Sequence, residues 1–512
     1  MGAMLLARIV EVSTAVAATR SRLEKRRLIA DLLREAEGAD EVELAATYLS
    51  GTLRQRRTGL GWRALADLPP PAAEASVRLV EVDTTLERLS VLAGSGSTTA
   101  RRAAAGDLFA RLTGPEQDFL RAVLTGNVRQ GALDSVMLDA IAAAAEVPLE
   151  EVRRAAMFSA PTGPIAAAAL TGGTEALQRF TLLVGRPVRP MLAGTAPDVA
   201  AGVEKVAAGA SLAVDTKLDG IRIQVHRHGD EVAVFTRSLD EIGERLPEVV
   251  AVARSLPGGD LVLDGEALTL DEQGRPRPFQ DTASTTATHT GATGIRPFFF
   301  DLLLDGEDSL IERPTHERLA RLDAVVPEEH RVTRLVTDSP DEAGAFFDAA
   351  VAAGQEGVIL KRLDAPYDAG RRGSAWVKVK PRHTLDLVVL GVECGSGRRE
   401  GWLSNLHLGA RDDRPGHDGF VMLGKTFKGM TDEMLAWQTE RFLALETSLT
   451  AHTVRVRPEQ VVEIAFDGVQ RSTRYPGGVA LRFARVVRYR DDKTAAEADT
   501  IDAVRSGAWM AT

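Results

Sequence analysis

The stretch that decides the fold is LAVDTKLDGIRIQVHR, residues 212–227. Apolar and polar side chains alternate before Lys217 and again after Gly220, which predicts two short strands over 212–216 and 221–227. The four residues KLDG join these strands, so the pattern places a lysine on a loop at the end of a strand. Taken alone, a lysine in such a turn is more often a solvated hairpin residue than a functional group.

Charged residues end or interrupt several further apolar strands. The segments are LDGE (263–266), FFFD (298–301), EGVILK (356–361) and WVKVK (376–380), and Arg237 ends the hairpin that follows the opening stretch. A spacing of two residues points charges to one face of a sheet. The cations gathered in this way are Lys217, Arg222, Arg237, Lys361, Lys378 and Lys380, against the two acids Glu266 and Glu356.

Such a face is typical of an anion site that also binds one or two cations, and triphosphate with a divalent metal is the natural ligand pair. The alternative for any one strand lysine is an edge-strand residue that blocks aggregation. Six cations at the ends of strands rich in Val and Ile are difficult to explain in that way alone.

Taken in order, these segments resemble the motifs of the covalent nucleotidyltransferase superfamily, and within it ATP-dependent DNA ligases of the three-domain bacterial and archaeal type. KLDGIR (217–222) resembles the nucleotidyl-lysine motif, the next four motifs match around Glu266, Phe300, 356–361 and 376–380, and RFARVVR (482–488) with DDK (491–493) resembles the last. The sequence departs from the family pattern at Asp215, where Glu is usual, and at Ala484, where Pro is usual.

The resemblance implies a reaction and its residues. Lys217 attacks the α-phosphate of ATP, AMP then passes to a 5′-phosphate at a nick in duplex DNA, and the 3′-hydroxyl displaces AMP. By family position Arg222 and Glu266 hold the ribose, Phe300 stacks on adenine, and Glu266 with Glu356 binds Mg²⁺. The implied ATP-binding residues are Asp215, Lys217, Arg222, Arg237, Glu266, Phe300, Arg372, Lys378 and Lys380, and those that orient pyrophosphate are Arg482, Arg485 and Lys493.

The fold class we expect is multidomain α+β. Residues 1–185 show helical periodicity and predict an all-α domain, which the resemblance makes DNA-binding. Residues 186–383 predict the α+β adenylation (nucleotidyltransferase) domain. Residues 384–512 predict a small β-barrel, which the resemblance makes an OB-fold, with strands that include 385–392, 419–423 and 481–488 and one helix over 432–445. A hinge near 381–384 would let the last domain move over the nucleotide.

Candidate DNA contacts lie in both outer domains. Arg129 in the helical domain and Lys425 and Lys428 in the barrel are expected to meet phosphates, although a solvated surface is an open alternative for each. The same alternative is at least as strong for Arg54, Arg56, Arg57, Arg101 and Arg102.

GFVMLGKT (419–426) matches the letters of a phosphate-binding P-loop. A P-loop needs residues free to wrap around phosphate and a helix that starts at its lysine, whereas 420–423 read as a buried strand. We therefore predict a strand here and no phosphate loop.

The composition bounds the remaining properties. The chain has 512 residues, a formal charge of −10 and one cysteine, Cys394, which excludes an intrachain disulfide and a multi-cysteine zinc site and fits a cytoplasmic protein. No uninterrupted apolar run is long enough to span a membrane. The negative charge argues against nucleic acid only weakly, since a large chain can gather its basic residues on one face. We expect a monomer that acts in DNA replication, repair or recombination.

Three other functions fit the sequence less well. A capping-type guanylyltransferase shares the lysine motif and uses GTP, but would not carry about 185 helical residues upstream. An NAD-dependent ligase would need zinc-binding cysteines, which this sequence lacks. A non-catalytic DNA-binding protein on the same fold is disfavoured by the intact Lys217, Glu266, Glu356 and Lys378.

Overall fold

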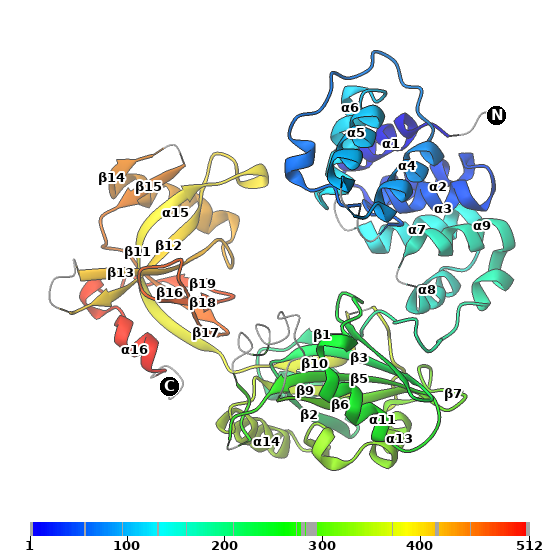
Figure 1. Ribbon diagram of the computed structural model, residues 1–512. Helices are drawn as coiled ribbons and strands as arrows, with labels where there is room; N and C mark the ends of the chain where they lie inside the picture. Colours follow the sequence, from blue (N-terminus) through cyan, green and yellow to red (C-terminus); the bar gives the residue numbers. More distant parts are fainter. Residues whose placement is uncertain are drawn as a thin grey trace.

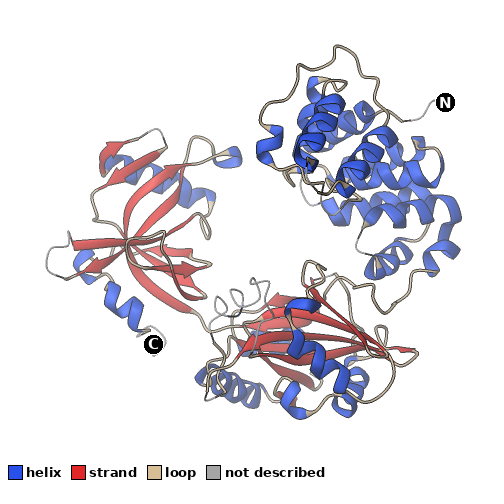
Figure 2. Ribbon diagram, viewed as in Figure 1, coloured by secondary structure: helices blue, strands red, loops and turns tan. Residues whose placement is uncertain are grey.

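The computed structural model describes residues 4–507, except 56–57, 95, 131–132, 160, 208, 273, 278–281, 283–293, 371, 415–418 and 451. Three bodies follow one another along the chain and lie around an open centre (Figure 1). The first is helical, the second combines sheets with helices, and the third is mostly sheet (Figure 2). Within the described residues no helix is long and apolar enough to cross a membrane.

The helical region packs around one continuous apolar core. Its helices are α1 (Leu6–Ala18), α2 (Arg22–Glu35), α3 (Gly38–Leu49), α4 (Leu79–Val91), α5 (Ser97–Phe109), α6 (Gly114–Leu124), α7 (Leu133–Ala145), α8 (Leu149–Phe158) and α9 (Thr162–Gln178). The start of α6 is encoded locally: Thr113 and Glu116 form a capping box, which satisfies backbone N–H groups that the first turn leaves without partners.

Residues 186–383, which the sequence predicts to be an adenylation domain and which we call the adenylation region, contain two five-stranded sheets. The first has the order β1 (Leu192–Thr195), β10 (Arg372–Val379), β9 (Gly357–Arg362), β2 (Leu212–Lys217), β8 (Arg334–Thr337). The second has the order β4 (Glu231–Thr236), β3 (Ile221–His228), β5 (Leu261–Thr269), β6 (Ile295–Asp305), β7 (Asp308–Ser309). The predicted hairpin is confirmed as β3 and β4, with Gly229 at a positive φ of 56° in its turn.

Helices cover one face of each sheet. In the first sheet, α10 (Val199–Ala207) and α14 (Pro340–Ala352) pack on alternate apolar strand residues. In the second sheet, α11 (Pro247–Ser255) and α13 (Thr315–Val325) do the same. Because strand side chains alternate between faces, the residues at the other positions of β2, β9 and β10 point away from these helices. Those positions carry the charged residues of the site.

The C-terminal region is built on a seven-stranded sheet in which β13, β12, β11, β15 and β14 are neighbours and β16 pairs with both β11 and β19. The bounds are β11 (His383–Cys394), β12 (Leu403–Asp412), β13 (Gly419–Thr426), β14 (Glu446–Leu449), β15 (Thr453–Val456), β16 (Val461–Phe466) and β19 (Arg485–Tyr489). A separate ribbon joins β17 (Gly468–Arg471) to β18 (Val479–Arg482). The helices are α15 (Asp432–Ala444), capped by Thr431, and α16 (Ile501–Ser506).

One expectation for this region needs correction, two strands were not foreseen, and one expectation is confirmed. The strand expected over 481–488 is broken, because Phe483 takes a left-handed conformation (φ 54°) and separates β18 from β19. The short strands β14 and β15 were not predicted. The supposed P-loop is the strand β13, which pairs antiparallel with β12, and no helix begins at Lys425.

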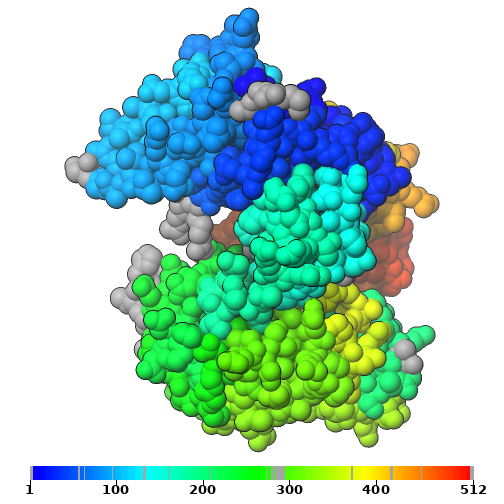
Figure 3. All heavy atoms as spheres, turned by 90° about the vertical axis from the view of Figure 1, so that its right-hand side faces the viewer, coloured from blue at the N-terminus to red at the C-terminus, as the bar shows by residue number. Residues whose placement is uncertain are grey.

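The helical and adenylation regions share an apolar cluster. Phe158 of α8 and Leu182 and Val188 of the connection pack with Val262 of β5 and Leu303 of β6. Figure 3 shows the end of the helical region lying directly on the adenylation region. The connection is therefore docked against the second sheet.

Candidate active site

Lys217 is the last residue of β2, at the point where the chain crosses from the first sheet to the second. The structure extends the expected strand by one residue, because Lys217 still pairs with Gly357 of β9. The crossing needs Gly220: a Cβ there would lie 2.4 Å from the carbonyl oxygen of Ala267. The glycine lets the turn pass close to β5, which brings the lysine next to Glu266.

The strand registers place the charged residues of the first sheet in adjoining rows. Lys361 lies opposite Trp376, Asp215 and Lys378 both lie opposite Ile359, and Lys217 lies opposite Gly357. All of these occupy the face that the helices leave uncovered. The sequence pattern of alternate charges therefore becomes one wall of a pocket.

The pocket lies between the two sheets and takes its lining from both. The first sheet contributes β1, β2, β9 and β10, and the second contributes β3, β5 and β6. Predicted site residues that line the pocket are Asp215, Lys217, Arg222, Arg237, Glu266, Phe300 and Lys378. The pocket thus brings together seven residues from five strands and the end of a hairpin.

One side of the pocket is aromatic. Phe300 and Trp376 meet edge to face with their ring centroids 5.9 Å apart. The ammonium group of Lys361 lies 4.5 Å from the centroid of the Trp376 ring, and its Nζ donates to the carbonyl of Phe300 at 2.8 Å. Cations near these ring faces stabilise the arrangement by cation–π attraction. An apolar wall with polar groups at its edge results.

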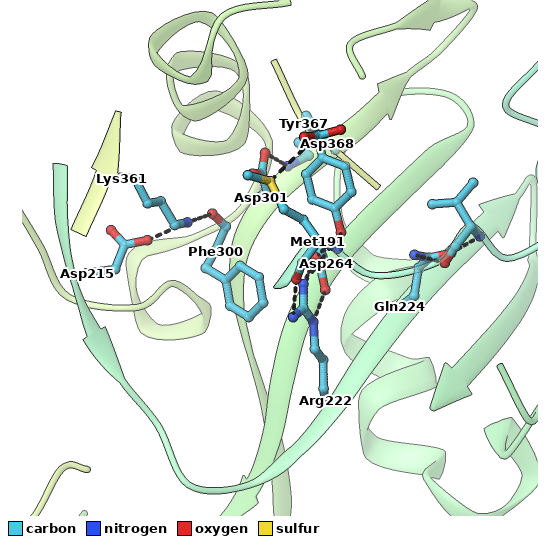
Figure 4. Close-up of polar contacts among 12 residues, drawn as sticks. Met191, Asp215, Arg222, Gln224, Asp264, Phe300, Asp301, Lys361, Tyr367 and Asp368 are labelled. Atoms are coloured by element: carbon cyan, nitrogen blue, oxygen red, sulfur yellow. Dashed lines mark hydrogen bonds and ion pairs between the residues drawn. The ribbon is translucent and has the colours of Figure 1, made fainter. Parts of the chain in front are cut away.

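Arg222 is held in place by buried partners (Figure 4). Its Nε and Nη2 donate to Asp264 at 3.0 and 2.6 Å, and its Nη1 donates to the carbonyl of Met191 at 2.7 Å. Tyr367 completes the network, since its hydroxyl donates to Asp264 at 2.6 Å and accepts from the backbone N–H of Met191 at 2.9 Å. The planar guanidinium therefore has a fixed orientation under Phe300, whose ring centroid lies 5.3 Å away.

Asp215 is also paired inside the protein. Arg334 of β8 donates to it at 2.6 Å. The ammonium of Lys361 lies 2.6 Å from its other oxygen (Figure 4). The carboxylate is almost fully buried, so two cations compensate its desolvation.

The two predicted metal-binding acids differ in their surroundings. Glu266 accepts a hydrogen bond from the backbone N–H of Gly220 at 3.2 Å, and burial raises its pKa to about 7 although Lys217 and Arg222 act to lower it. Glu356 forms ion pairs with both Lys217 and Lys380. Glu356 is thus a charged partner of the nucleophile candidate, while Glu266 changes its charge near neutral pH.

The C-terminal region contacts the site through two side chains, Arg482 and Asp467. Arg482 at the end of β18 pairs with Asp219 of the KLDG turn, with Nη1 and Oδ2 2.6 Å apart. Asp467, directly after β16, lies 3.0 Å from the Nζ of Lys380 and 3.6 Å from the Nη1 of Arg485. These contacts hold the C-terminal region over the end of β2.

Other predicted residues lie elsewhere. Lys493 pairs with Asp386 inside the C-terminal region. Lys425 pairs with Glu393, and Lys428 lies 5.5 Å from the ring centroid of the exposed Phe483. Arg372 begins β10, but its side chain lies outside the described residues.

The candidate DNA contacts of the helical region divide into two groups. Arg129 is exposed and lines a cavity with Arg398, Arg399 and Phe427 of the C-terminal region. Arg54 pairs with three acids and Arg101 donates to backbone carbonyls, which favours a structural role for both. Arg102 is exposed, and Arg56 and Arg57 lie outside the described residues.

Four residues that hold the site together were not predicted as site residues. Asp264 stands inside the quoted LDGE segment, so the sequence carried a signal for it. Tyr367 and Arg334 come from a loop and a strand with no motif. Asp467 follows an ordinary strand, and its role depends on how the C-terminal region is placed.

Comparison with known proteins assigns the family. Residues 190–380 match the model of the ATP dependent DNA ligase domain, and residues 399–493 match the ATP dependent DNA ligase C terminal region. A "Probable DNA ligase" of Beutenbergia cavernae is 63% identical over 98% of this chain and 99% of that protein, and one of Nocardioides sp. is 62% identical over 99% of both. The solved structure "Pmar-Lig_PreS3" shares the fold, with a TM-score of 0.61 at 19% identity over 94% of this chain and 99% of that one. The chain therefore belongs to the family of ATP-dependent DNA ligases.

Proposed function

We propose that this chain seals nicks in duplex DNA through a lysyl-AMP intermediate on Lys217. The observation that carries the proposal is the position of Lys217, which lines a pocket with an aromatic wall and a cationic wall and stands two residues before Asp219, the partner of Arg482 in another region. An adenosine fits the first wall and a triphosphate fits the second. Gly220 lets the chain cross from β2 to β3 close to β5, and this crossing places the end of β2, which carries Lys217, between the two walls.

The reaction begins when the Nζ of Lys217 bonds to the α-phosphorus of ATP, the bond to the bridging oxygen breaks, and pyrophosphate leaves. A 5′-phosphate oxygen at the nick then takes the adenylyl group, and the 3′-hydroxyl displaces AMP. An ammonium group has no lone pair, so the amine of Lys217 must give up a proton before it attacks. Its ion pair with Glu356 describes the state before this proton leaves.

On the nucleoside side, Phe300 stacks on adenine and Asp215 lies at the base end of the pocket. Arg222 and Glu266 face the ribose. Arg222 already donates to Asp264 and Met191, so most of its N–H groups are in use. We therefore propose that it packs beside the ribose and supplies a fixed positive charge there. Only its remaining N–H groups could donate directly to the ribose.

On the phosphate side, Arg237, Arg372, Lys378 and Lys380 bind the transferring phosphate, and Arg482, Arg485 and Lys493 orient pyrophosphate. Cations arranged in advance stabilise the charge that develops in phosphoryl transfer. Lys493 now pairs with Asp386, so this role requires it to change partners.

Glu266 and Glu356 have the chemistry to hold Mg²⁺ together with the triphosphate. Among the described residues no group of three or more His, Cys, Asp or Glu side chains could bind a metal by itself, and Mg²⁺ commonly uses one or two carboxylates plus substrate phosphates and water. Bound there, Mg²⁺ would neutralise phosphate charge.

The outer regions would hold the DNA. We propose that residues 1–185 form an all-α DNA-binding domain, 186–383 the adenylation domain and 384–512 an OB-fold, with Arg129, Lys425 and Lys428 near the phosphates. The backbone N–H of Val486 in β19 donates to the carbonyl of Lys428 after β13, which supports closure of a barrel. A monomer acting on chromosomal DNA in the cytoplasm, in replication, repair or recombination, fits this function.

The test is covalent labelling. The protein is incubated with labelled ATP, GTP or NAD and divalent metal, then denatured. ATP with Mg²⁺ should leave label on the protein, and Lys217→Ala should abolish it while the circular dichroism spectrum stays unchanged. Preferential labelling by GTP would indicate a guanylyltransferase, and absence of any label would indicate a non-catalytic protein.

A further inference from the structure

We propose that Asp467 is a positioning residue that locks the hinge between the adenylation and C-terminal regions, and that loss of the positive charge on Lys217 releases this lock. The inference rests on the proposed function, in which Lys217 changes from an ammonium to an uncharged phosphoramidate. It adds a physical link between that change and the position of the C-terminal region.

The lock lies at the hinge itself. Only three residues separate the end of β10 at Val379 from the start of β11 at His383, and His383 pairs with Phe466, the last residue of β16. Asp467 follows immediately. Its Oδ2 lies 3.0 Å from the Nζ of Lys380, and its backbone N–H donates to the carbonyl of Arg482 at 2.9 Å. An ion pair across so short a connection restricts rotation of one region against the other.

A continuous row of alternating charges joins this lock to the nucleophile. Lys217 pairs with Glu356, Glu356 pairs with Lys380, and Lys380 pairs with Asp467. The four side chains are 14–21% exposed, so water and salt screen their interactions in part. Burial acts to lower the pKa of Lys380, but Glu356 and Asp467 outweigh it and the pKa is raised. Lys380 is thus shared between an acid of each region.

Neutralising Lys217 changes how Lys380 is shared. The four formal charges sum to zero while Lys217 is an ammonium, because two lysines face two acids. They sum to −1 once its Nζ is bonded to phosphorus, and the AMP phosphate adds a further negative charge. Lys380 is then the remaining partner of Glu356 in the row. Lys380 is drawn towards Glu356, and its ion pair with Asp467 is weakened. Arg485, 3.6 Å away in the same region, offers Asp467 another partner as the hinge opens.

The experiment measures the separation of the two regions in the full chain. Cys394 is the only cysteine, is exposed, and lies in the C-terminal region, so a fluorophore can be attached there directly. Ser309→Cys provides the second position on an exposed part of the adenylation region. Single-molecule energy transfer between the two dyes then reports the fractions of closed and open molecules in the absence of nucleotide.

The decisive comparison is Lys217→Ala against Lys217→Arg, neither of which can form lysyl-AMP. The alanine variant removes the charge and should raise the ratio of open to closed molecules on the order of tenfold. The arginine variant keeps the charge and should resemble the unsubstituted protein. If the Lys217 side chain acted only by its packing, the open-to-closed ratio would not depend on whether the substituted side chain is charged. Equal separations for both would overturn the proposal.

Asp467→Asn should open the hinge without nucleotide, whatever stands at position 217. Its matched control is Glu459→Gln, an exposed acid of the same region that pairs with Arg457 at 2.7 Å, which should leave the separation unchanged. Raising the salt concentration should open the unsubstituted protein towards the state of Asp467→Asn, and this series keeps the proposal testable if a variant folds poorly. A closed Asp467→Asn protein would contradict the lock. Since no nucleotide is present, failure here is distinguishable from failure of self-adenylylation.

Discussion

Ion pairs inside the adenylation region differ in construction from those at its boundary with the C-terminal region. Inside, Arg318 and Asp301 are fully buried, and Asp264 beside Arg222 is 1% exposed. At the boundary, Arg482 and Asp219 are 26% and 31% exposed. Buried pairs with several hydrogen bonds keep their partners, because separation would leave an unpaired charge without water. Partly exposed pairs can exchange partners. The inner pairs therefore shape the nucleotide pocket, and the boundary pairs can respond to what enters it.

The largest expected effect is the difference in the free energy of unfolding between a variant that breaks an inner pair and a variant that breaks a boundary pair. Asp264 is 1% exposed and accepts several hydrogen bonds, so Asp264→Asn removes a fully paired carboxylate, leaves the 18% exposed Arg222 beside a neutral amide, and should lower the free energy of unfolding by about 3–5 kcal/mol. Asp467 is about one-fifth exposed, and Asp467→Asn should lower the free energy of unfolding by about 0–1 kcal/mol. Chemical denaturation of both variants measures the difference. Equal losses would erase the distinction between inner and boundary pairs.

The next effect concerns the chemistry of a boundary residue. Arg485→Ala should slow self-adenylylation by about tenfold to a hundredfold, because a cation that orients pyrophosphate is lost. Sealing of a nick that already carries AMP should be largely kept. The control is Arg488→Ala, on the same strand, whose side chain is exposed and pairs with Glu463. If Arg485→Ala impairs both steps equally, its role is not confined to the leaving group.

Glu266 sharpens the comparison because it is a half-buried acid without a direct side-chain ion pair among the contacts described. Its pKa of about 7 lies above its ordinary value of 4.5, so ionisation costs stability in the folded state. The stability that the protonated group contributes is complete below about pH 4.5 and is lost as the pH rises through about 7. The stability of the unsubstituted protein relative to Glu266→Gln should therefore fall between pH 5 and pH 8. Thermal unfolding over this range measures it, and parallel curves would contradict the raised pKa.

The smallest effect on activity is expected for a substitution outside both the inner pairs and the boundary pairs. Lys425 of β13 pairs with Glu393 of β11, outside the nucleotide pocket. Lys425→Ala should leave the rate and the apparent KM for ATP in self-adenylylation within about twofold of the unsubstituted protein, since the GFVMLGKT segment is a strand. Loss of ATP binding by a folded variant would show that this segment does bind phosphate.

The sequence predicted the residues that line the pocket better than the residues that hold those side chains in place. Asp215, Lys217 and Lys378 come together because alternate strand residues share one face of the first sheet, a rule that acts over a few residues. Tyr367 lies 103 positions from Asp264, and nothing in its local sequence marks a buried hydroxyl. The partner of Lys380 depends on how two regions are placed, which no local pattern encodes. The break at Phe483 was missed because a left-handed residue there looks like any other strand residue in sequence.

The most direct test of the central claim is a single turnover without free nucleotide. The protein is charged with ATP, freed of ATP and pyrophosphate, and mixed with a duplex that carries one nick. We expect one sealed nick and one AMP for each lysyl-AMP, with sealing falling steeply as salt is raised because DNA binding releases counterions. If charged protein keeps its AMP in the presence of nicked DNA, or seals only when ATP is added, Lys217 does not carry the intermediate of ligation.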